Sequence, residues 1–211
     1  MDSGRRMKLV IIDYGMGNLT SVANAFASLG ARPEIIVHPG EMEGADRIVL
    51  PGVGAFGDGM ASLRSGGWID PLHRAVLEEG TPFLGICLGM QILASEGTEN
   101  GHHEGLGWIP GSVERIATGD PDVRVPHIGW NDVRFLKDTG MYRGLGDSRT
   151  FYFVNSYVLQ PEDPSVISGT FTYGREYVAS IEAGPVAATQ FHPEKSQKAG
   201  LAVLKNYLGS G

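Results

Sequence analysis

A short stretch around the single cysteine constrains the fold of this chain more than any other. Residues 81–86 form a mostly apolar run after a Gly-Thr-Pro boundary, which predicts a buried strand. Apolar residues then recur at helical spacing over 88–94, which predicts a helix that starts at or just after Cys87. Gly85-Ile86-Cys87-Leu88-Gly89 matches the G-x-nucleophile-x-G elbow, whose glycines permit a sharp strand-to-helix turn. We therefore expect the Cys87 thiol at the start of a helix, where the helix dipole favours the thiolate.

The first half of the chain alternates between strands and helices. We expect strands over 8–14, 32–38 and 46–50, and helices over 18–29, 56–65 and 68–79. This alternation predicts the α/β class, with a single open doubly wound sheet that is mostly parallel and flanked by helices. The cysteine strand is the fourth of the series, and ligands bind at the carboxyl ends of such strands.

The second half of the chain is rich in short β runs. We expect strands over 107–116, 128–136, 150–159, 166–173, 177–182 and 186–191, and a closing amphipathic helix over 198–208. Residues 173–176 resemble a hairpin connection. No linker or repeat separates the two halves, so we expect a β-rich C-terminal extension of the same sheet. The expected domain covers 7–209, with 1–6 as a loose leader and Met7 as an alternative start.

Composition narrows the possible functions. The net charge of −7 argues against a nucleic-acid surface, and no early apolar run is long enough for a signal core or a membrane span. One cysteine cannot form an internal disulfide, which favours a reducing cytoplasm. The adjacent His102 and His103 share no face of a helix or strand, so we expect no metal site there. Gly15 and Gly17 lack the third glycine of a dinucleotide-binding loop.

The C-terminal third supplies the base that a cysteine nucleophile needs. His192 and Glu194 are two residues apart at a predicted strand end, so both side chains can point the same way. A carboxylate beside the imidazole fixes its tautomer and stabilises the imidazolium, as in a nucleophile–base–orienter triad. An isolated cysteine is more often a small buried apolar residue, so the elbow and the His-Pro-Glu stretch carry the catalytic interpretation.

These stretches resemble the class I glutamine amidotransferases over nearly the whole chain. The resemblance is carried by the cysteine elbow and by residues 12–19, 50–57, 126–131, 151–157 and 191–196. Within that family, Tyr-Gly-Met-Gly-Asn, Pro-Gly-Val-Gly and Gly-Trp-Asn are similar to the branch that supplies ammonia to a (β/α)8-barrel cyclase in histidine biosynthesis. The resemblance implies hydrolysis of L-glutamine through a glutamyl thioester on Cys87, with no metal or organic cofactor.

The resemblance also implies roles for other residues. The backbone N–H groups of Val53 and Leu88 would form the oxyanion hole, after the Val53 strand reorients. The expected substrate contacts are Gly52, Gln91, Asn155 and Ser156, and the expected contacts with the cyclase in a heterodimer are Asn18, Trp130 and Lys195. Many relatives carry histidine where this chain has Asn155, so only the backbone contacts from 155 and 156 carry over directly.

Other interpretations remain open from the sequence. Residues 51–54 could form an ordinary strand-to-helix turn instead of an oxyanion hole. Trp130 could be a core residue, and Lys195 could be a solvated surface charge, instead of partner contacts. The chain could serve another synthase, such as one forming pyridoxal phosphate or anthranilate. A non-enzymatic binding module on the same fold would keep Cys87 inert. A cysteine peptidase is disfavoured because Gln91 and the Pro-Gly-Val-Gly stretch match the amidotransferases.

Overall fold

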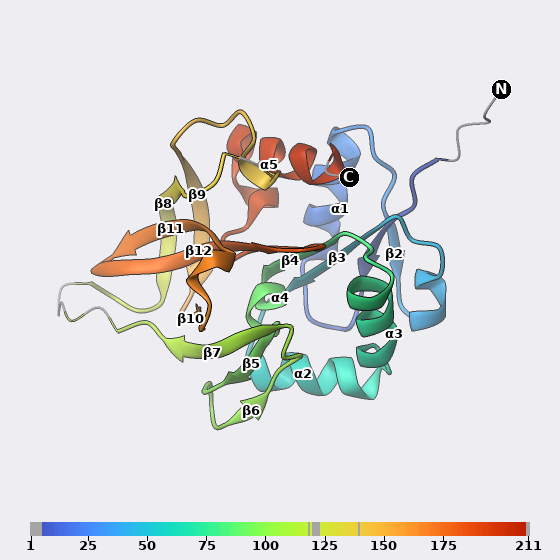
Figure 1. The fold of residues 1–211 in the computed structure, drawn as a ribbon, viewed down its shortest axis with the longest axis horizontal. Helices are drawn as coiled ribbons and strands as arrows, with labels where there is room; N and C mark the ends of the chain where they lie inside the picture. The colour runs from blue at the N-terminus through green and yellow to red at the C-terminus, as the bar shows by residue number, and fades with distance from the viewer. Residues whose placement is uncertain (1–5, 118, 120–122, 139, 210–211) are drawn as a thin grey trace.

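A nine-stranded sheet with helices on both faces forms the centre of the protein (Figure 1). The computed structural model describes residues 6–117, 119, 123–138 and 140–209, so the expected leader lies outside the described residues except for Arg6. The strand order is β2-β1-β3-β4-β13-β12-β11-β8-β9. The strands are β1 (Leu9–Ile12), β2 (Glu34–Ile36), β3 (Arg47–Gly52), β4 (Phe83–Cys87), β8 (His127–Phe135), β9 (Ser148–Asn155), β11 (Ile167–Tyr173), β12 (Arg175–Ala183) and β13 (Val186–Thr189).

The expected α/β class is confirmed, although the sheet is parallel over only part of its width. The strands from β2 to β13 pair in parallel, whereas β12, β11, β8 and β9 are added antiparallel. The connections from β11 to β12 and from β12 to β13 are too short for anything but antiparallel pairing. In the 173–176 hairpin, for example, Tyr173 pairs with Arg175 across a single glycine.

A second sheet corrects the expectation of a single one. Its order is β10-β7-β5-β6, and its strands are β5 (Ala94–Gly97), β6 (His103–Glu104), β7 (Ile109–Arg115) and β10 (Tyr157–Pro161). The run expected as one strand over 150–159 is divided at Ser156, where the chain passes from β9 in the large sheet to β10 in the small one. Strand propensity alone does not specify which sheet a residue joins, because pairing partners are distant in sequence.

The helices cover the two faces of the large sheet (Figure 1). They are α1 (Leu19–Ser28), α2 (Phe56–Ser65), α3 (Ile69–His73), α4 (Leu88–Gln91) and α5 (Gln197–Gly209), with a π-helical turn at Arg74–Glu78 and 3₁₀ turns at Pro39–Met42, Gly140–Tyr142, Pro164–Val166 and Pro193–Lys195. The bounds of α2 are those expected. The helix after Cys87 is shorter than expected, because the chain enters β5 at Ala94 instead of continuing the helix.

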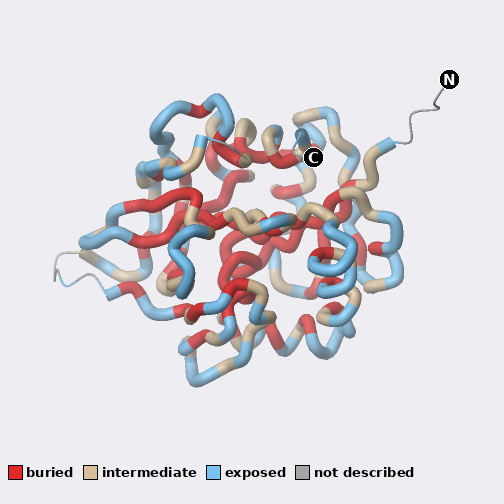
Figure 2. The backbone as a smooth tube through the Cα atoms, viewed as in Figure 1, coloured by how far each residue is buried: buried red, intermediate tan, exposed pale blue. Residues whose placement is uncertain are grey.

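Two apolar cores lie on opposite faces of the sheet. Alternate residues of β1, such as Val10 and Ile11, belong to different cores, as the period of two requires. Figure 2 shows the buried tube concentrated along the central strands. Phe56 of α2 packs in one core, and Phe26 of α1 packs in the other with α5 residues. Among the described residues, no helix combines the length and apolar character needed to cross a membrane.

Candidate active site

Cys87 ends β4 in a strained conformation that only a tight elbow requires. Its φ of 55° and ψ of −106° lie outside the regions that L-residues prefer, and strain of this kind is concentrated at functional sites. A Cβ atom on Gly89 would collide with the carbonyl oxygen of Leu50, and one on Gly85 would collide with the carbonyl oxygen of Gly89. The two glycines therefore let α4 turn back against β3 and β4, which fixes the position of the thiol.

The pairing of β13 with β4 brings His192 to the same edge of the sheet as Cys87. The two strands are parallel, with Thr189 opposite Ile86, so the chain beyond each strand enters the same region. The His192 Nδ1 atom lies 2.8 Å from Oε1 of Glu194, which is in the 3₁₀ turn that follows. The structure thus brings together the three residues expected to form a triad.

The imidazole of His192 is held in a charged environment. Burial alone would lower its pKa, but its interactions with the Cys87 thiol and the Glu194 carboxylate outweigh burial and raise the pKa to about 10. The imidazolium form therefore prevails at neutral pH. An imidazolium beside the sulfur stabilises a thiolate and can donate a proton to a leaving amine.

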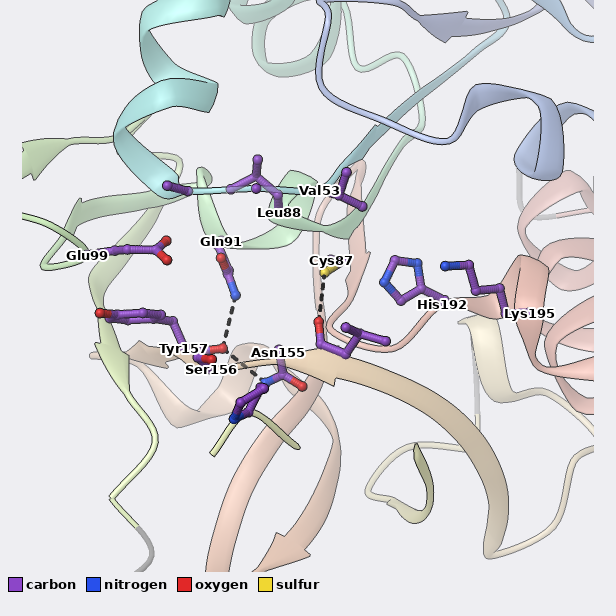
Figure 3. A pocket seen from close by; sticks show the side chains of 14 residues that line it. Val53, Cys87, Leu88, Gln91, Glu99, Asn155, Ser156, Tyr157, His192 and Lys195 are labelled. Carbon is purple, nitrogen blue, oxygen red and sulfur yellow. Dashed lines mark hydrogen bonds between the residues drawn. The ribbon is translucent and has the colours of Figure 1, made fainter. Parts of the chain in front are cut away.

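A pocket of about 360 Å³ opens beside the thiol. In Figure 3, His192 and Lys195 lie on one side of Cys87, and Gln91, Glu99 and Tyr157 lie on the other. The lining residues are Val53, Gly54, Ala55, Cys87, Leu88, Gln91, Glu99, Pro126, Val154, Asn155, Ser156, Tyr157, His192 and Lys195. Of the expected substrate contacts, Gln91, Asn155 and Ser156 line this pocket. Gly52 lies directly behind it, opposite Cys87 in the β3–β4 register.

The Val53 N–H does not face the pocket as an oxyanion donor. It donates a hydrogen bond to the carbonyl oxygen of Met16, at 3.1 Å. Met16 belongs to the loop between β1 and α1, and Val53 is 45% exposed. In this conformation one of the two expected oxyanion donors is engaged elsewhere, so the expected reorientation of this segment would have to break the Val53–Met16 hydrogen bond.

The polar wall opposite His192 is held by amide groups. Gln91 donates from Nε2 to the carbonyl oxygen of Tyr157, at 3.0 Å, and Asn155 donates from Nδ2 to the same oxygen, also at 3.0 Å. The Asn155 Oδ1 atom is buried and has no hydrogen-bond partner among the described residues. Gln91 and Asn155 are thus immobilised in the pocket wall, where a bound polar group could satisfy the remaining acceptor.

The three expected partner contacts lie at different places around this site. Lys195 is exposed and lines the pocket. Asn18 is exposed and caps α1, accepting a hydrogen bond from the Ser21 N–H at 3.4 Å. Trp130, on β8, is 49% exposed, packs edge-on against Tyr152 and lines a separate groove.

Three further residues that the sequence analysis does not predict lie close to the site. Glu99 lines the pocket from the loop after β5, and its Oε2 accepts a hydrogen bond from the Phe56 N–H at 3.0 Å. Burial and the charge of Cys87 raise the pKa of Tyr14, so its phenol stays protonated. Gln190 contacts Cys87 directly, with Nε2 at 3.7 Å from Sγ. Gln190 had a detectable signal, because a residue two positions before His192 in an extended segment shares its face.

His127 lies away from the pocket lining. It is 3% exposed, stacks on Phe171 and packs against Phe153 and Tyr173, so it is a structural residue of the aromatic core. Burial lowers its pKa to about 4. Within the described ranges, no group of three or more His, Cys, Asp or Glu side chains has the arrangement of a metal site.

Comparison with known proteins gives matches along most of the chain. Residues 10–208 match the family model described as glutamine amidotransferase class-I. The imidazole glycerol phosphate synthase subunit HisH of Syntrophotalea carbinolica is 48% identical over 204 residues, covering 94% of this chain and 98% of that protein. The HisH subunit of Moorella thermoacetica is 47% identical over 199 residues, covering 94% of this chain and 93% of that protein. The structure of PurLQS from Thermotoga maritima superposes with a TM-score of 0.76 at 18% identity, covering 97% and 99%, and so supports the fold alone.

Proposed function

The chain belongs to the class I glutamine amidotransferase family, and from this premise we propose that it is the glutaminase subunit of imidazole glycerol phosphate synthase. It hydrolyses L-glutamine to glutamate and ammonia. A cyclase subunit uses that ammonia to form imidazole glycerol phosphate and an aminoimidazole carboxamide ribotide. The observation that carries this proposal is that the Cys87 elbow and His192 line one pocket, with Glu194 bonded to Nδ1 of His192.

The first half-reaction is acylation of Cys87. The thiolate attacks the side-chain carboxamide carbon of glutamine and forms a tetrahedral oxyanion. His192, as imidazolium, donates its proton to the amide nitrogen, the C–N bond breaks, and ammonia leaves. The product is a glutamyl thioester on Cys87. Glu194 holds Nδ1 of His192 throughout, which keeps Nε2 directed at the reacting atoms.

The second half-reaction is hydrolysis of the thioester. His192 is now neutral and takes a proton from a water molecule, whose oxygen attacks the thioester carbon. Collapse of the second tetrahedral intermediate breaks the C–S bond, releases glutamate and restores the thiolate. The N–H groups of Val53 and Leu88 stabilise the oxyanion in both steps, and losing one such donor typically costs about 10²–10³ in rate.

Recognition of glutamine is assigned to the polar wall of the pocket. Gln91 and the backbone at Asn155 and Ser156 hold the substrate beside the thiol. Glu99 contributes a carboxylate to the same lining, and we assign it to the α-ammonium group of the substrate. Lys195 offers the opposite charge on the far side of Cys87 (Figure 3).

The proposed partner is a (β/α)8-barrel cyclase, bound as a heterodimer through Asn18, Trp130 and Lys195. The hydrogen bond between Val53 and Met16 supports a switch, since Met16 lies two residues before Asn18. Docking at Asn18 would move the Met16 carbonyl, free the Val53 N–H and complete the oxyanion hole. Service to a pyridoxal phosphate or anthranilate synthase is not favoured, because these curated relatives are subunits of imidazole glycerol phosphate synthase.

The proposed domain covers residues 7–209, and the family match over 10–208 supports these limits. We place the protein in the cytoplasm, because its single cysteine can form no internal disulfide, which is typical of proteins from a reducing compartment.

The test measures glutamate release by the free chain, by its complex with the cyclase, and by the complex with cyclase ligand. Wild type should be slow alone and fast in the liganded complex, and folded Cys87→Ala should be inactive in all three. Glutamate release by Cys87→Ala would contradict the nucleophile assignment. The switch is wrong if the free chain is already as fast as the liganded complex. Lys195→Ala and Trp130→Ala should weaken activation; unaltered activation would show that those two residues do not transmit the switch.

A further inference from the structure

Gln190 is a buried polar residue next to the Cys87 sulfur, and the mechanism above gives it no role. It follows β13, is fully buried, and donates its backbone N–H to the Ala179 carbonyl at 2.8 Å. Its side chain does not line the pocket. Instead Nε2 approaches Cys87 Sγ at 3.7 Å, which is hydrogen-bond distance for the large sulfur atom, and Oε1 lies 3.1 Å from Nε2 of Gln91.

The chemistry of the surrounding groups fixes which end of the Gln190 carboxamide faces the sulfur. The main-chain carbonyl oxygen of Tyr157 can only accept, so the Gln91 atom facing it must be the amide nitrogen. The same nitrogen faces Gln190, so Gln190 must present its oxygen there. The Gln190 nitrogen is then left facing Cys87. The Tyr157 carbonyl oxygen thus orients the Gln91 amide, and the Gln91 amide orients the Gln190 amide so that its N–H group points at the Cys87 sulfur.

We propose that Gln190 is a further catalytic residue that stabilises the Cys87 thiolate by donating a hydrogen bond to its sulfur, with its orientation set by Gln91. A donor at this place favours the thiolate, because a charged acceptor strengthens the hydrogen bond. The neutral thiol has another contact, with Sγ 3.9 Å from the Val154 carbonyl, which a thiolate cannot use. Gln190 therefore distinguishes the two protonation states of the sulfur.

Gln91 acquires a second role in this arrangement. Its carboxamide lines the substrate pocket and also holds Gln190, so it connects the substrate wall with the nucleophile. Replacing Gln91 would release the Gln190 amide as well as weaken glutamine binding. Gln190 itself does not line the pocket, and Gln91 keeps its hydrogen bond to Tyr157 when Gln190 is replaced, so the effect should fall on kcat and much less on KM.

The test follows alkylation of Cys87 by iodoacetamide from pH 5 to 10, with intact mass as the readout. Cys87 is the single cysteine, so the reaction reports on one sulfur. The titratable groups near it are Tyr14, His192 and Glu194, with Glu99 and Lys195 on the pocket lining, and none of them is changed.

Gln190→Met keeps the size of the side chain and removes the donor. Its midpoint pH for alkylation should rise by about one unit, with alkylation about tenfold slower below the midpoint. In Gln190→Glu the midpoint pH for alkylation should rise further, because a carboxylate beside the sulfur disfavours the thiolate. Ser180→Ala is the matched control, since it removes a fully buried hydroxyl from the neighbouring strand β12, and its midpoint should not move. Wild-type midpoints in both folded Gln190 variants would overturn the proposal.

A measurement on the unaltered side chain covers the case in which the Gln190 variants do not fold. The chain has four glutamines, Gln91, Gln160, Gln190 and Gln197, so their ¹⁵N-labelled side-chain amides give few signals. The Gln190 amide proton should shift with pH through the alkylation midpoint in wild type, and this shift should vanish in Cys87→Ala. A Gln190 signal that does not respond to pH would also overturn the proposal.

The inference rests on the proposed role of Cys87, but its failure is distinguishable from failure of that role. Alkylation and amide shifts do not require glutamine hydrolysis. A wild-type midpoint in Gln190→Met with normal glutaminase activity would refute only the role of Gln190. No glutaminase activity in the wild-type liganded complex would refute the proposed function itself.

Discussion

Replacing Glu194 with glutamine removes one charge from the buried His192–Glu194 pair without changing its size. The two side chains are 4% and 2% exposed, and the imidazole Nδ1 lies 2.8 Å from Glu194 Oε1. The second carboxylate oxygen, Oε2, is buried without a hydrogen-bond partner among the described residues, so the attraction to His192 is the main interaction that the charge makes. A carboxamide can still offer its oxygen to Nδ1 and keep the tautomer, but it does not stabilise the imidazolium.

The expected loss of rate follows from the difference between the two hydrogen bonds. A bond to a charged group contributes about 1.5–3 kcal/mol and a neutral one about 0.5–1.5 kcal/mol, so the change weakens the interaction by about 1–1.5 kcal/mol. That difference corresponds to roughly a tenfold lower kcat. His192→Ala removes proton transfer altogether, which costs about 10²–10⁴. Glu194→Gln should therefore be impaired less than His192→Ala.

The assay is the pH dependence of glutaminase kcat in the liganded complex. Activity needs the imidazolium as proton donor, so the alkaline limb of wild type should follow the raised pKa of His192, about 10. Removing a charge that raises this pKa should move the limb to lower pH. An unmoved limb, or a Glu194→Gln enzyme as slow as His192→Ala, would refute the assignment of Glu194 as the group that orients and stabilises His192.

Three other substitutions test separate parts of the account. Glu99→Gln should raise KM for glutamine about tenfold with a smaller change in kcat, because it removes an ion pair with the substrate; an unchanged KM would exclude that contact. Gly52→Ala should lower the free energy of unfolding by about 1–3 kcal/mol in urea, because its Cβ would collide with the Tyr14 hydroxyl. His127→Phe should reduce the loss of stability on acidification. The pKa of His127 is lowered to about 4 in the folded chain, so its contribution is present above pH 6.5 and is lost as pH falls through 4. Between pH 6.5 and 4, the free energy of unfolding of the wild type should fall by up to ~3 kcal/mol more than that of the variant.

Local sequence predicts the parts of the fold that local interactions determine. The bounds of α2 follow from its apolar spacing, and the elbow follows from two glycines that the close approach of α4 to β3 requires. The apolar spacing after Cys87 predicts a helix to residue 94, but the helix ends at Gln91. Pairing of Ala94 with Ile109 in the small sheet overrides the helical spacing there. That pairing depends on residues distant in sequence, so local propensity does not predict it.

Some residues of the candidate site are likewise predictable from local sequence, whereas others depend on distant parts of the chain. Sequence motifs predict Cys87, His192 and Glu194, and the parallel pairing of β13 with β4 explains why they meet. Glu99 gave no usable signal, because it lies in a polar, glycine-rich loop whose path is fixed by the small sheet. The hydrogen bond from Val53 to Met16 was also inaccessible, since a backbone N–H carries no sequence information about its acceptor.

The central claim is that glutamine is hydrolysed through a covalent intermediate on Cys87. The most direct measurement mixes ¹⁴C-glutamine with the liganded complex, quenches it in acid within milliseconds, and maps the label by peptide mass spectrometry. We expect a glutamyl adduct on the peptide that contains Cys87, forming and decaying fast enough to account for turnover, and none in Cys87→Ser. Steady glutamate release with no adduct on that peptide at any quench time, or an adduct that decays more slowly than turnover, would contradict the account.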